Sequence, residues 1–106
     1  MPPHKYTKLF KCIYDNKYQA LEQVLTTTNI DPNTTNEVGL TPTHVACMLN
    51  HWKCLEVLIN DSRTVLTLHA PDGRTPYDCA LAEHSHQCVA LLASIPGISD
   101  TTAITL

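Results

Sequence analysis

The sequence predicts an all-α solenoid in which three helix-turn-helix units stack side by side. The main observation is a repeat: residues 39–46 (GLTPTHVA) return as residues 73–80 (GRTPYDCA), at an offset of 73 − 39 = 34. The same offset aligns Val24 with Leu58 and Leu58 with Leu92, so that apolar residues meet apolar residues through three copies. A fixed period of roughly 20–50 residues is typical of stacked repeats, whose units bury their apolar faces against their neighbours.

The helices follow in order from this register and from local start signals. Thr41 can cap a helix through its hydroxyl, and Pro42 then takes the first helical position, where a missing N–H costs nothing. Thr75 and Pro76 repeat this arrangement, and Asp78 follows the cap by three residues, as in a capping box. The first unit carries the pattern only in degenerate form. We expect helices over residues 7–15, 17–27, 42–50, 52–60, 76–83 and 86–94.

These units resemble the ankyrin repeat. The resemblance is carried by Thr-Pro-x-His-x-Ala at residues 41–46, Asp-Pro-Asn at residues 31–33 and Leu-Glu-Val-Leu-Ile at residues 55–59. It implies antiparallel helix pairs joined by projecting hairpin loops, here at residues 28–41 and 61–75, and a role in protein–protein recognition. The expected domain is 1–97, with repeats at about 4–37, 38–70 and 71–97, followed by a polar tail at 98–106.

Two turns are expected to need a left-handed backbone. The resemblance places Asn50 and His84 at the end of the first helix of a repeat, where the family prefers glycine. Asparagine tolerates the left-handed region and histidine accepts it less readily, so that we expect a slightly strained turn in the third repeat.

The five cysteines all align with apolar or small residues of the other repeats. Cys54 and Cys88 share one position, and Cys79 aligns with Val45. Free cysteine behaves as a small buried hydrophobe, and an odd number of cysteines without a signal peptide argues against a disulfide framework. We therefore expect buried thiols in a cytoplasmic or nuclear protein. No apolar run approaches the roughly 18 residues of a membrane span, so membrane insertion is not expected.

Four residues of types that bind zinc lie close together, at His44, Cys47, His51 and Cys54. The register ends the helix near Asn50, between them, and assigns both cysteines to the core. The resemblance gives His44 a structural role, as the histidine that bonds the threonine of its own turn. A metal-binding or thiol-sensing protein is kept as the alternative hypothesis. No HExxH, GxSxG or Gly-rich phosphate motif is present, so we expect neither an enzyme nor a cofactor.

The resemblance also implies a binding surface formed by hairpin tips and inner helices. Val38 and Leu40 are expected to be exposed on the first hairpin, whereas Met48 and Leu49 are equally compatible with exposure and with packing on the neighbouring inner helix. Tyrosine, methionine and arginine are favoured in protein interfaces. The candidate partner-binding residues are Tyr6, Tyr14, Glu37, Val38, Leu40, Met48, Leu49, Asp72, Arg74 and Glu83.

Charge is distributed unevenly along the chain, whose net charge is −3. Residues 1–17 carry four lysines and one aspartate, whereas the remainder carries three cations and nine acidic residues. The N-terminal lysines are interpreted either as a solvated helix face or as a docking end for an acidic partner. The balance is too acidic for nucleic-acid binding. The sequence thus predicts a non-catalytic adaptor, scaffold or inhibitor that binds another protein of unknown identity; self-association and a spacer role in a larger protein stay open.

Overall fold

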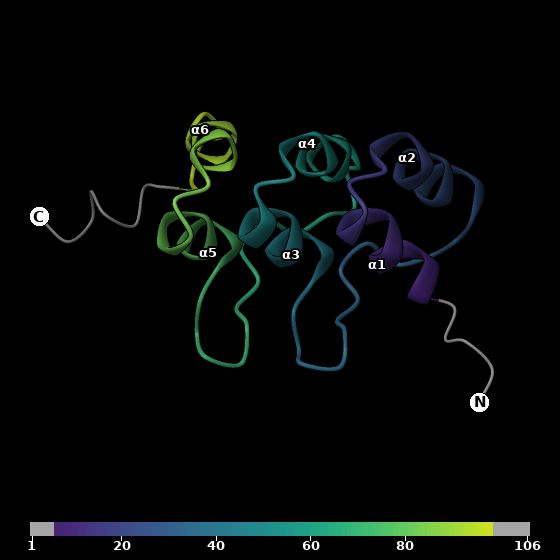
Figure 1. Cartoon of the computed structure of the whole chain (residues 1–106), viewed down its shortest axis with the longest axis horizontal. Coiled ribbons are helices and arrows are strands. Elements are labelled where there is room, and N and C mark those ends of the chain that lie inside the picture. The colour runs from purple at the N-terminus through teal and green to yellow at the C-terminus, as the bar shows by residue number, and fades with distance from the viewer. Residues whose placement is uncertain (1–5, 99–106) are drawn as a thin grey trace, which may run out of the picture.

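The computed structural model describes residues 6–98 and arranges six helices in two layers (Figure 1). They are α1 (Thr7–Tyr14), α2 (Tyr18–Thr27), α3 (Pro42–Leu49), α4 (Trp52–Asn60), α5 (Pro76–Ala82) and α6 (His86–Ala93). Helices α1, α3 and α5 form the inner layer, from which the two hairpin loops project, and α2, α4 and α6 form the outer layer. The expected helices are confirmed, each end within one residue. The expected polar tail, apart from residue 98, lies outside the described residues.

The first helix of the second and third repeats begins with the expected cap. In α3 the Thr41 hydroxyl accepts a hydrogen bond from the His44 N–H at 3.2 Å, and His44 Nδ1 accepts one from the Thr41 N–H at 3.4 Å. In α5 the Thr75 hydroxyl and the Asp78 carboxylate make the same reciprocal pair, at 3.2 and 3.0 Å. Helix α1 has no side-chain cap of this kind, which is the structural counterpart of its degenerate motif.

A left-handed residue ends the first helix of all three repeats. Asn16, Asn50 and His84 have φ angles of 56°, 56° and 57°. The expectation for Asn50 and His84 is confirmed, and Asn16 makes the same turn in the first repeat. Each turn is closed by a backbone hydrogen bond: Lys17 to Cys12 (2.7 Å), His51 to Ala46 (2.9 Å) and Ser85 to Ala80 (2.9 Å).

The two hairpins have the same closing bond and touch each other. In the first hairpin the Asn36 N–H donates to the Leu40 carbonyl at 2.9 Å, and the equivalent bond in the second hairpin is 2.7 Å long. Gly39 has a φ of +88°, and a Cβ atom there would come within 2.5 Å of Pro71 Cγ in the second hairpin. The hairpins therefore project in the same direction as one packed pair (Figure 1).

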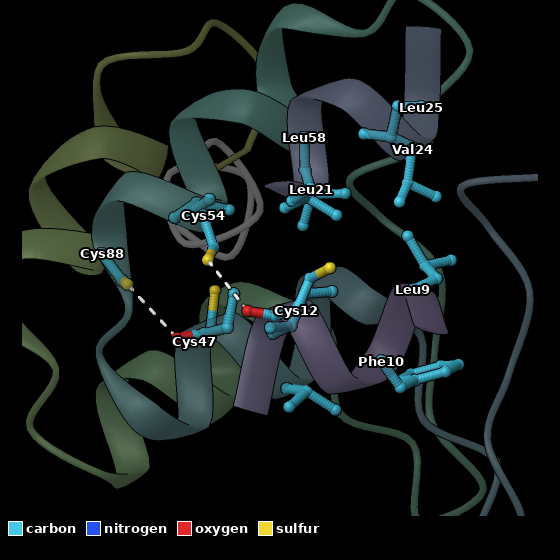
Figure 2. Close-up of a cluster of buried hydrophobic side chains, with 14 of the residues drawn as sticks. Leu9, Phe10, Cys12, Leu21, Val24, Leu25, Cys47, Cys54, Leu58 and Cys88 are labelled. Carbon is cyan, nitrogen blue, oxygen red and sulfur yellow. Dashed lines mark hydrogen bonds between the residues drawn. The ribbon is translucent and has the colours of Figure 1, made fainter. Parts of the chain in front are cut away.

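The core runs along the stack between the two helix layers. Its large, fully buried apolar side chains are Leu9, Ile13, Leu21, Leu55, Leu58 and Leu92. All five cysteines are free and buried, as predicted, and Figure 2 shows four of them among the apolar side chains. The Cys54 and Cys88 thiols point at helix carbonyls of the preceding repeat, at 4.0 and 3.7 Å. Because burial raises the pKa of Cys54 to about 11, this thiol packs rather than reacts.

Candidate partner-binding face

A groove lined by aromatic rings lies between α1 and the first hairpin, with a volume of about 640 Å³. The Phe10 and Tyr14 rings lie 6.3 Å apart, centroid to centroid. The Tyr14 hydroxyl accepts a hydrogen bond from Asn36 Nδ2 at 3.1 Å, which ties the helix to the hairpin. We call this the aromatic groove; its lining is Tyr6, Thr7, Phe10, Lys11, Tyr14, Asp15, Thr35, Asn36 and Glu37.

A second groove, of about 280 Å³, lies between the hairpins and helices α3 and α5. We call it the hairpin groove; its lining is Val38, Leu40, Met48, Ala70, Pro71, Asp72, Arg74, Cys79 and Glu83. It adjoins the aromatic groove at the tip of the first hairpin, because Glu37 lines one groove and Val38 the other. The two grooves therefore form one continuous face along the hairpins and inner helices.

Nine of the ten sequence-predicted residues line one of these grooves. The exception is Leu49, which is 46% exposed outside both. Val38 is 66% exposed, as expected, and Met48 is 38% exposed, so the question of its packing is answered in favour of exposure. Leu40 corrects the expectation of exposure: it is half-buried, because its side chain packs against the core at the base of the hairpin.

Sequence reasoning missed the residues that shape these grooves. Asn36 organises the first hairpin, because its side-chain oxygen accepts hydrogen bonds from the N–H groups of Val38 at 3.1 Å and Leu40 at 3.0 Å. Pro71 forms a wall of the hairpin groove and contacts the first hairpin at Gly39. An asparagine three residues before a glycine is a turn signal that could have identified Asn36. The position of Pro71 depends on the packing of two repeats, which no local signal reports.

The charged groups of the face are partly paired. Lys11 Nζ lies 3.2 Å from Asp15, and Arg74 Nε lies 3.4 Å from Asp72, so that each groove holds one exposed ion pair. Glu37 and Glu83 have no ion-pair partner within residues 6–98. Such exposed pairs contribute little to stability. They do, however, decide which charges remain available to a partner.

His44 lies beneath this face as a structural residue. Its Nδ1 atom lies 2.7 Å from the Thr41 hydroxyl, and its Nε2 atom lies 2.9 Å from the Arg74 carbonyl in the next repeat. The ring is fully buried, and burial lowers the pKa of His44. A neutral ring that carries its proton on Nε2 satisfies both contacts: it accepts from the Thr41 hydroxyl and donates to the carbonyl. His44 thus joins two repeats directly below Arg74.

Within residues 6–98 no group of three or more His, Cys, Asp or Glu side chains is arranged to hold a metal ion. This finding bears on the metal-binding form of the His/Cys alternative and leaves thiol sensing untested. Among the six helices none is both long enough and apolar enough to cross a membrane.

A separate hollow lies on the outer layer, away from the grooves. Trp52 packs partly buried against the core and lines a hollow with Gln87 and Leu91 of α6. Lys53 Nζ lies 4.7 Å from the Trp52 ring centroid and 5.4 Å from that of Tyr18. The Trp52 ring is thus in cation–π contact with a lysine of its own chain.

Comparisons with known proteins agree with this architecture. A family model described as ankyrin repeats (3 copies) matches residues 9–103. One similar structure is a chain from the complex of Bd0816, a predatory endopeptidase from Bdellovibrio bacteriovorus, with immunity protein Bd3460. The TM-score is 0.74 at 19% sequence identity, and the match covers 83% of this chain and 45% of that chain. The human ASB11 ankyrin repeat domain gives a TM-score of 0.73, 20% identity, and coverages of 83% and 39%. The chain spans less than half the length of either. No curated protein matches its sequence.

Proposed function

This chain belongs to the ankyrin-repeat family, and we propose that it acts as a non-catalytic adaptor, scaffold or inhibitor that binds a partner protein. The fold is typically a protein–protein interaction module without catalysis. The observation that carries the proposal is the continuous face formed by the aromatic groove and the hairpin groove. The partner would contact the hairpin tips and the inner helices.

The proposal is supported by the apolar side chains that this face exposes. Val38 and Met48 in the hairpin groove and Tyr14 in the aromatic groove are each more than a third exposed. Contiguous exposed apolar surface on a soluble domain usually marks an interaction site, and methionine and tyrosine are enriched in interfaces. The similar chain from Bdellovibrio comes from a complex of an endopeptidase with an immunity protein, which makes inhibition one of the roles to test.

The experiment is affinity capture from a lysate of the source organism, followed by direct titration of each captured protein in purified form. The test variant is Val38→Asn with Met48→Gln, which removes exposed apolar groups without adding charge. The matched control is Val65→Asn with Leu81→Gln, at residues that are 43% and 47% exposed but lie outside both grooves. We expect a partner that binds the parent and the control and is lost by the test variant.

Two controls make this experiment decisive. Each variant must keep the helical circular-dichroism spectrum and the melting temperature of the parent, so that lost binding reports on the surface and not on folding. A partner that binds all three proteins equally would place its site elsewhere. If no protein distinguishes the variants, the face is not a binding site, and the spacer role in a larger protein becomes the better hypothesis.

A further inference from the structure

The charges left unpaired on the face are all negative. The charged residues that line the two grooves are Lys11, Asp15, Glu37, Asp72, Arg74 and Glu83. Both cations lie against an aspartate of the same groove. Glu37 and Glu83 remain without an ion-pair partner among the described residues, and both are exposed. The face therefore has two carboxylates in excess, at the junction of the grooves and at the rim of the hairpin groove.

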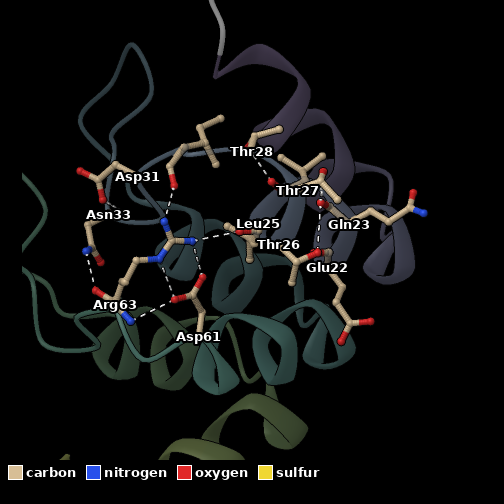
Figure 3. Close-up of polar contacts among 12 residues, drawn as sticks. Glu22, Gln23, Leu25, Thr26, Thr27, Thr28, Asp31, Asn33, Asp61 and Arg63 are labelled. Atoms are coloured by element: carbon tan, nitrogen blue, oxygen red, sulfur yellow. Dashed lines mark hydrogen bonds and ion pairs between the residues drawn. The ribbon is translucent and has the colours of Figure 1, made fainter.

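The other described cations form no ion pair with these two glutamates, and one of them, Lys17, is the N-cap residue of α2. Lys8 lines a hollow at the end of the stack formed with α2, and Lys53 covers aromatic rings on the outer layer. Arg63 is held by Asp61 at 2.7 Å and by carbonyls of the first repeat (Figure 3). The two lysines of α1 thus do not make the binding face basic.

The acidic positions alternate with apolar ones along the face. Glu37 lies between the aromatic rings of one groove and Val38 and Met48 of the other. Lysine and arginine can lay their aliphatic stems on apolar or aromatic surface while the charged end reaches a carboxylate. Complementary charge across an interface gives selectivity and speeds encounter, whereas like charge disfavours a partner. An anionic surface such as nucleic acid would meet repulsion here.

We propose that the partner docks through a short protein segment that carries lysine or arginine side chains flanked by apolar ones, with the cations at Glu37 and Glu83. This inference rests on the proposed function, because it concerns the same face and specifies the chemistry of its occupant. It reverses the interpretation in which the N-terminal lysines attract an acidic partner: on this face the exposed lysine, Lys11, is already paired with Asp15.

The test is selection from a phage-displayed random peptide library at neutral pH, with purified protein as bait. The charge variant is Glu37→Lys with Glu83→Lys. Its matched control is Glu22→Lys with Glu56→Lys, which makes the same change in net charge on the outer helices α2 and α4. The uncharged groove variant, Val38→Asn with Met48→Gln, identifies the peptides that use the face.

We expect the groove-dependent peptides to be net basic, with apolar residues beside each cation. Their affinity, measured by fluorescence polarisation, should be equal for the parent and the Glu22/Glu56 control and at least about tenfold weaker for the Glu37/Glu83 variant. Raising the ionic strength should weaken their binding to the parent, because exposed charge pairs are screened by salt.

Several results would overturn the inference. Groove-dependent peptides that are neutral or acidic, or that bind the Glu37/Glu83 variant as well as the parent, would refute the basic partner and leave the proposed function standing. Groove-dependent binding of a poly(U) RNA probe would refute it as well. A library that yields no groove-dependent peptide counts against this inference, whereas the proposed function fails only if the lysate experiment also finds no protein that distinguishes the variants.

Discussion

The boundary between the first and second repeats and the boundary between the second and third repeats are joined by different polar contacts. At the second boundary the buried His44 ring reaches the Arg74 carbonyl at 2.9 Å, and the Asn50 amide reaches Gln87 Oε1 at 2.6 Å. The residue 34 positions before His44 is Phe10, which is buried but has no polar atom to place across the first boundary.

The first boundary instead uses exposed and half-buried contacts near the ends of the outer helices (Figure 3). The Arg63 guanidinium, held by Asp61, donates to the carbonyls of Leu25 and Ile30, each at 3.1 Å. Asn33 bonds back to the same loop through both of its side-chain polar atoms, at 2.8 and 2.7 Å. These contacts tie the loop after α4 to the first repeat.

The difference shows that one repeat geometry can be maintained in two ways. The contact that distinguishes the second boundary is the fully buried His44 ring, whose loss leaves other buried groups unsatisfied and is therefore costly. The first boundary depends on several exposed or half-buried groups, whose partners water can reach more easily. We therefore expect substitutions that remove polar contacts to lower the stability of the fold by different amounts at the two boundaries. Substitutions in the shared apolar core should lower it by similar amounts.

The largest expected effect is the loss of a core leucine at either end of the stack. Leu21→Ala in the first repeat and Leu92→Ala in the third each remove a side chain that is fully buried. Each change should lower the free energy of unfolding by about 3–4 kcal/mol, from lost burial and the cavity that remains. Urea titration followed by circular dichroism measures both. A loss below about 1 kcal/mol for one of them would show that its repeat is outside the cooperative unit.

The next largest effect on stability distinguishes the polar contacts of the two boundaries. His44→Phe copies the first boundary into the second: it fills the space but leaves the Thr41 hydroxyl and the Arg74 carbonyl without their buried partner. We expect a loss of about 2–3 kcal/mol in the free energy of unfolding. His51→Phe is the comparison at the first boundary, because His51 bonds the Ile13 carbonyl at 2.7 Å from a half-buried position. Equal losses for the two variants would contradict the distinction drawn between the boundaries.

A pair of glycines tests the contact between the hairpins. Gly39 and Gly73 have φ angles of +88° and +92°, so that an alanine is strained at either position. Gly73→Ala meets no atom within 4 Å and should cost about 1 kcal/mol, the usual penalty of a left-handed backbone. Gly39→Ala also forces its Cβ against Pro71 and should cost about 1 kcal/mol more. Equal melting temperatures for the two variants would show that the hairpins do not press on each other.

A smaller effect on the free energy of unfolding comes from pH, through protonation of the same His44 ring. Burial lowers its pKa below the ordinary value of 6.5, so that between 6.5 and the lower folded value only the unfolded chain binds the proton. Stability from this group is complete above pH 6.5 and falls as the pH is lowered, by at most about 1.4 kcal/mol per pH unit. Urea titrations at a series of pH values should show a steeper loss below pH 6.5 for the parent than for His44→Phe. Parallel curves would exclude His44 as the source.

Much of this architecture could be predicted from sequence, because its signals are local or periodic. The Thr41 and Thr75 caps, the left-handed Asn50 and His84, and the buried cysteines each follow from a residue type at a fixed place in the 34-residue register. Nine of the ten candidate site residues line the grooves for the same reason, since the register places them on the hairpins or in and beside the inner helices.

The remainder depends on contacts between distant residues, which the register does not report. The 34-residue register aligns Arg63 with Asn29, and it gives no sign that the partners of Arg63 are carbonyls of a different repeat. Leu40 was expected on the surface because it lies in a hairpin, but the base of that hairpin packs on the core. A sum over residues 1–17 also misses the charge of the face, because Lys11 is the one lysine among the described residues of that stretch that lines the grooves, and it is paired there with Asp15.

The smallest expected effect concerns Arg63 and local opening. Arg63→Met removes the guanidinium contacts to Leu25, Ile30 and Asp61. The matched control is Arg74→Met, because among the described residues the Arg74 side chain pairs only with the neighbouring Asp72. The carbonyl of residue 74 still accepts the hydrogen bond from His44 in this control. The melting temperature should fall by a few degrees for Arg63→Met and less for the control.

The informative measurement for this variant is the rate at which buried thiols react with iodoacetamide in the folded protein, read by peptide mass spectrometry. Cys54 faces the Cys12 carbonyl across the first boundary, and Cys88 faces the Ala46 carbonyl across the second. A buried thiol reacts only when its surroundings open locally. Arg63→Met should therefore speed the labelling of Cys54 several-fold and leave Cys88 unchanged. If both thiols respond alike, the two boundaries open together, and their different polar contacts do not make them separate units.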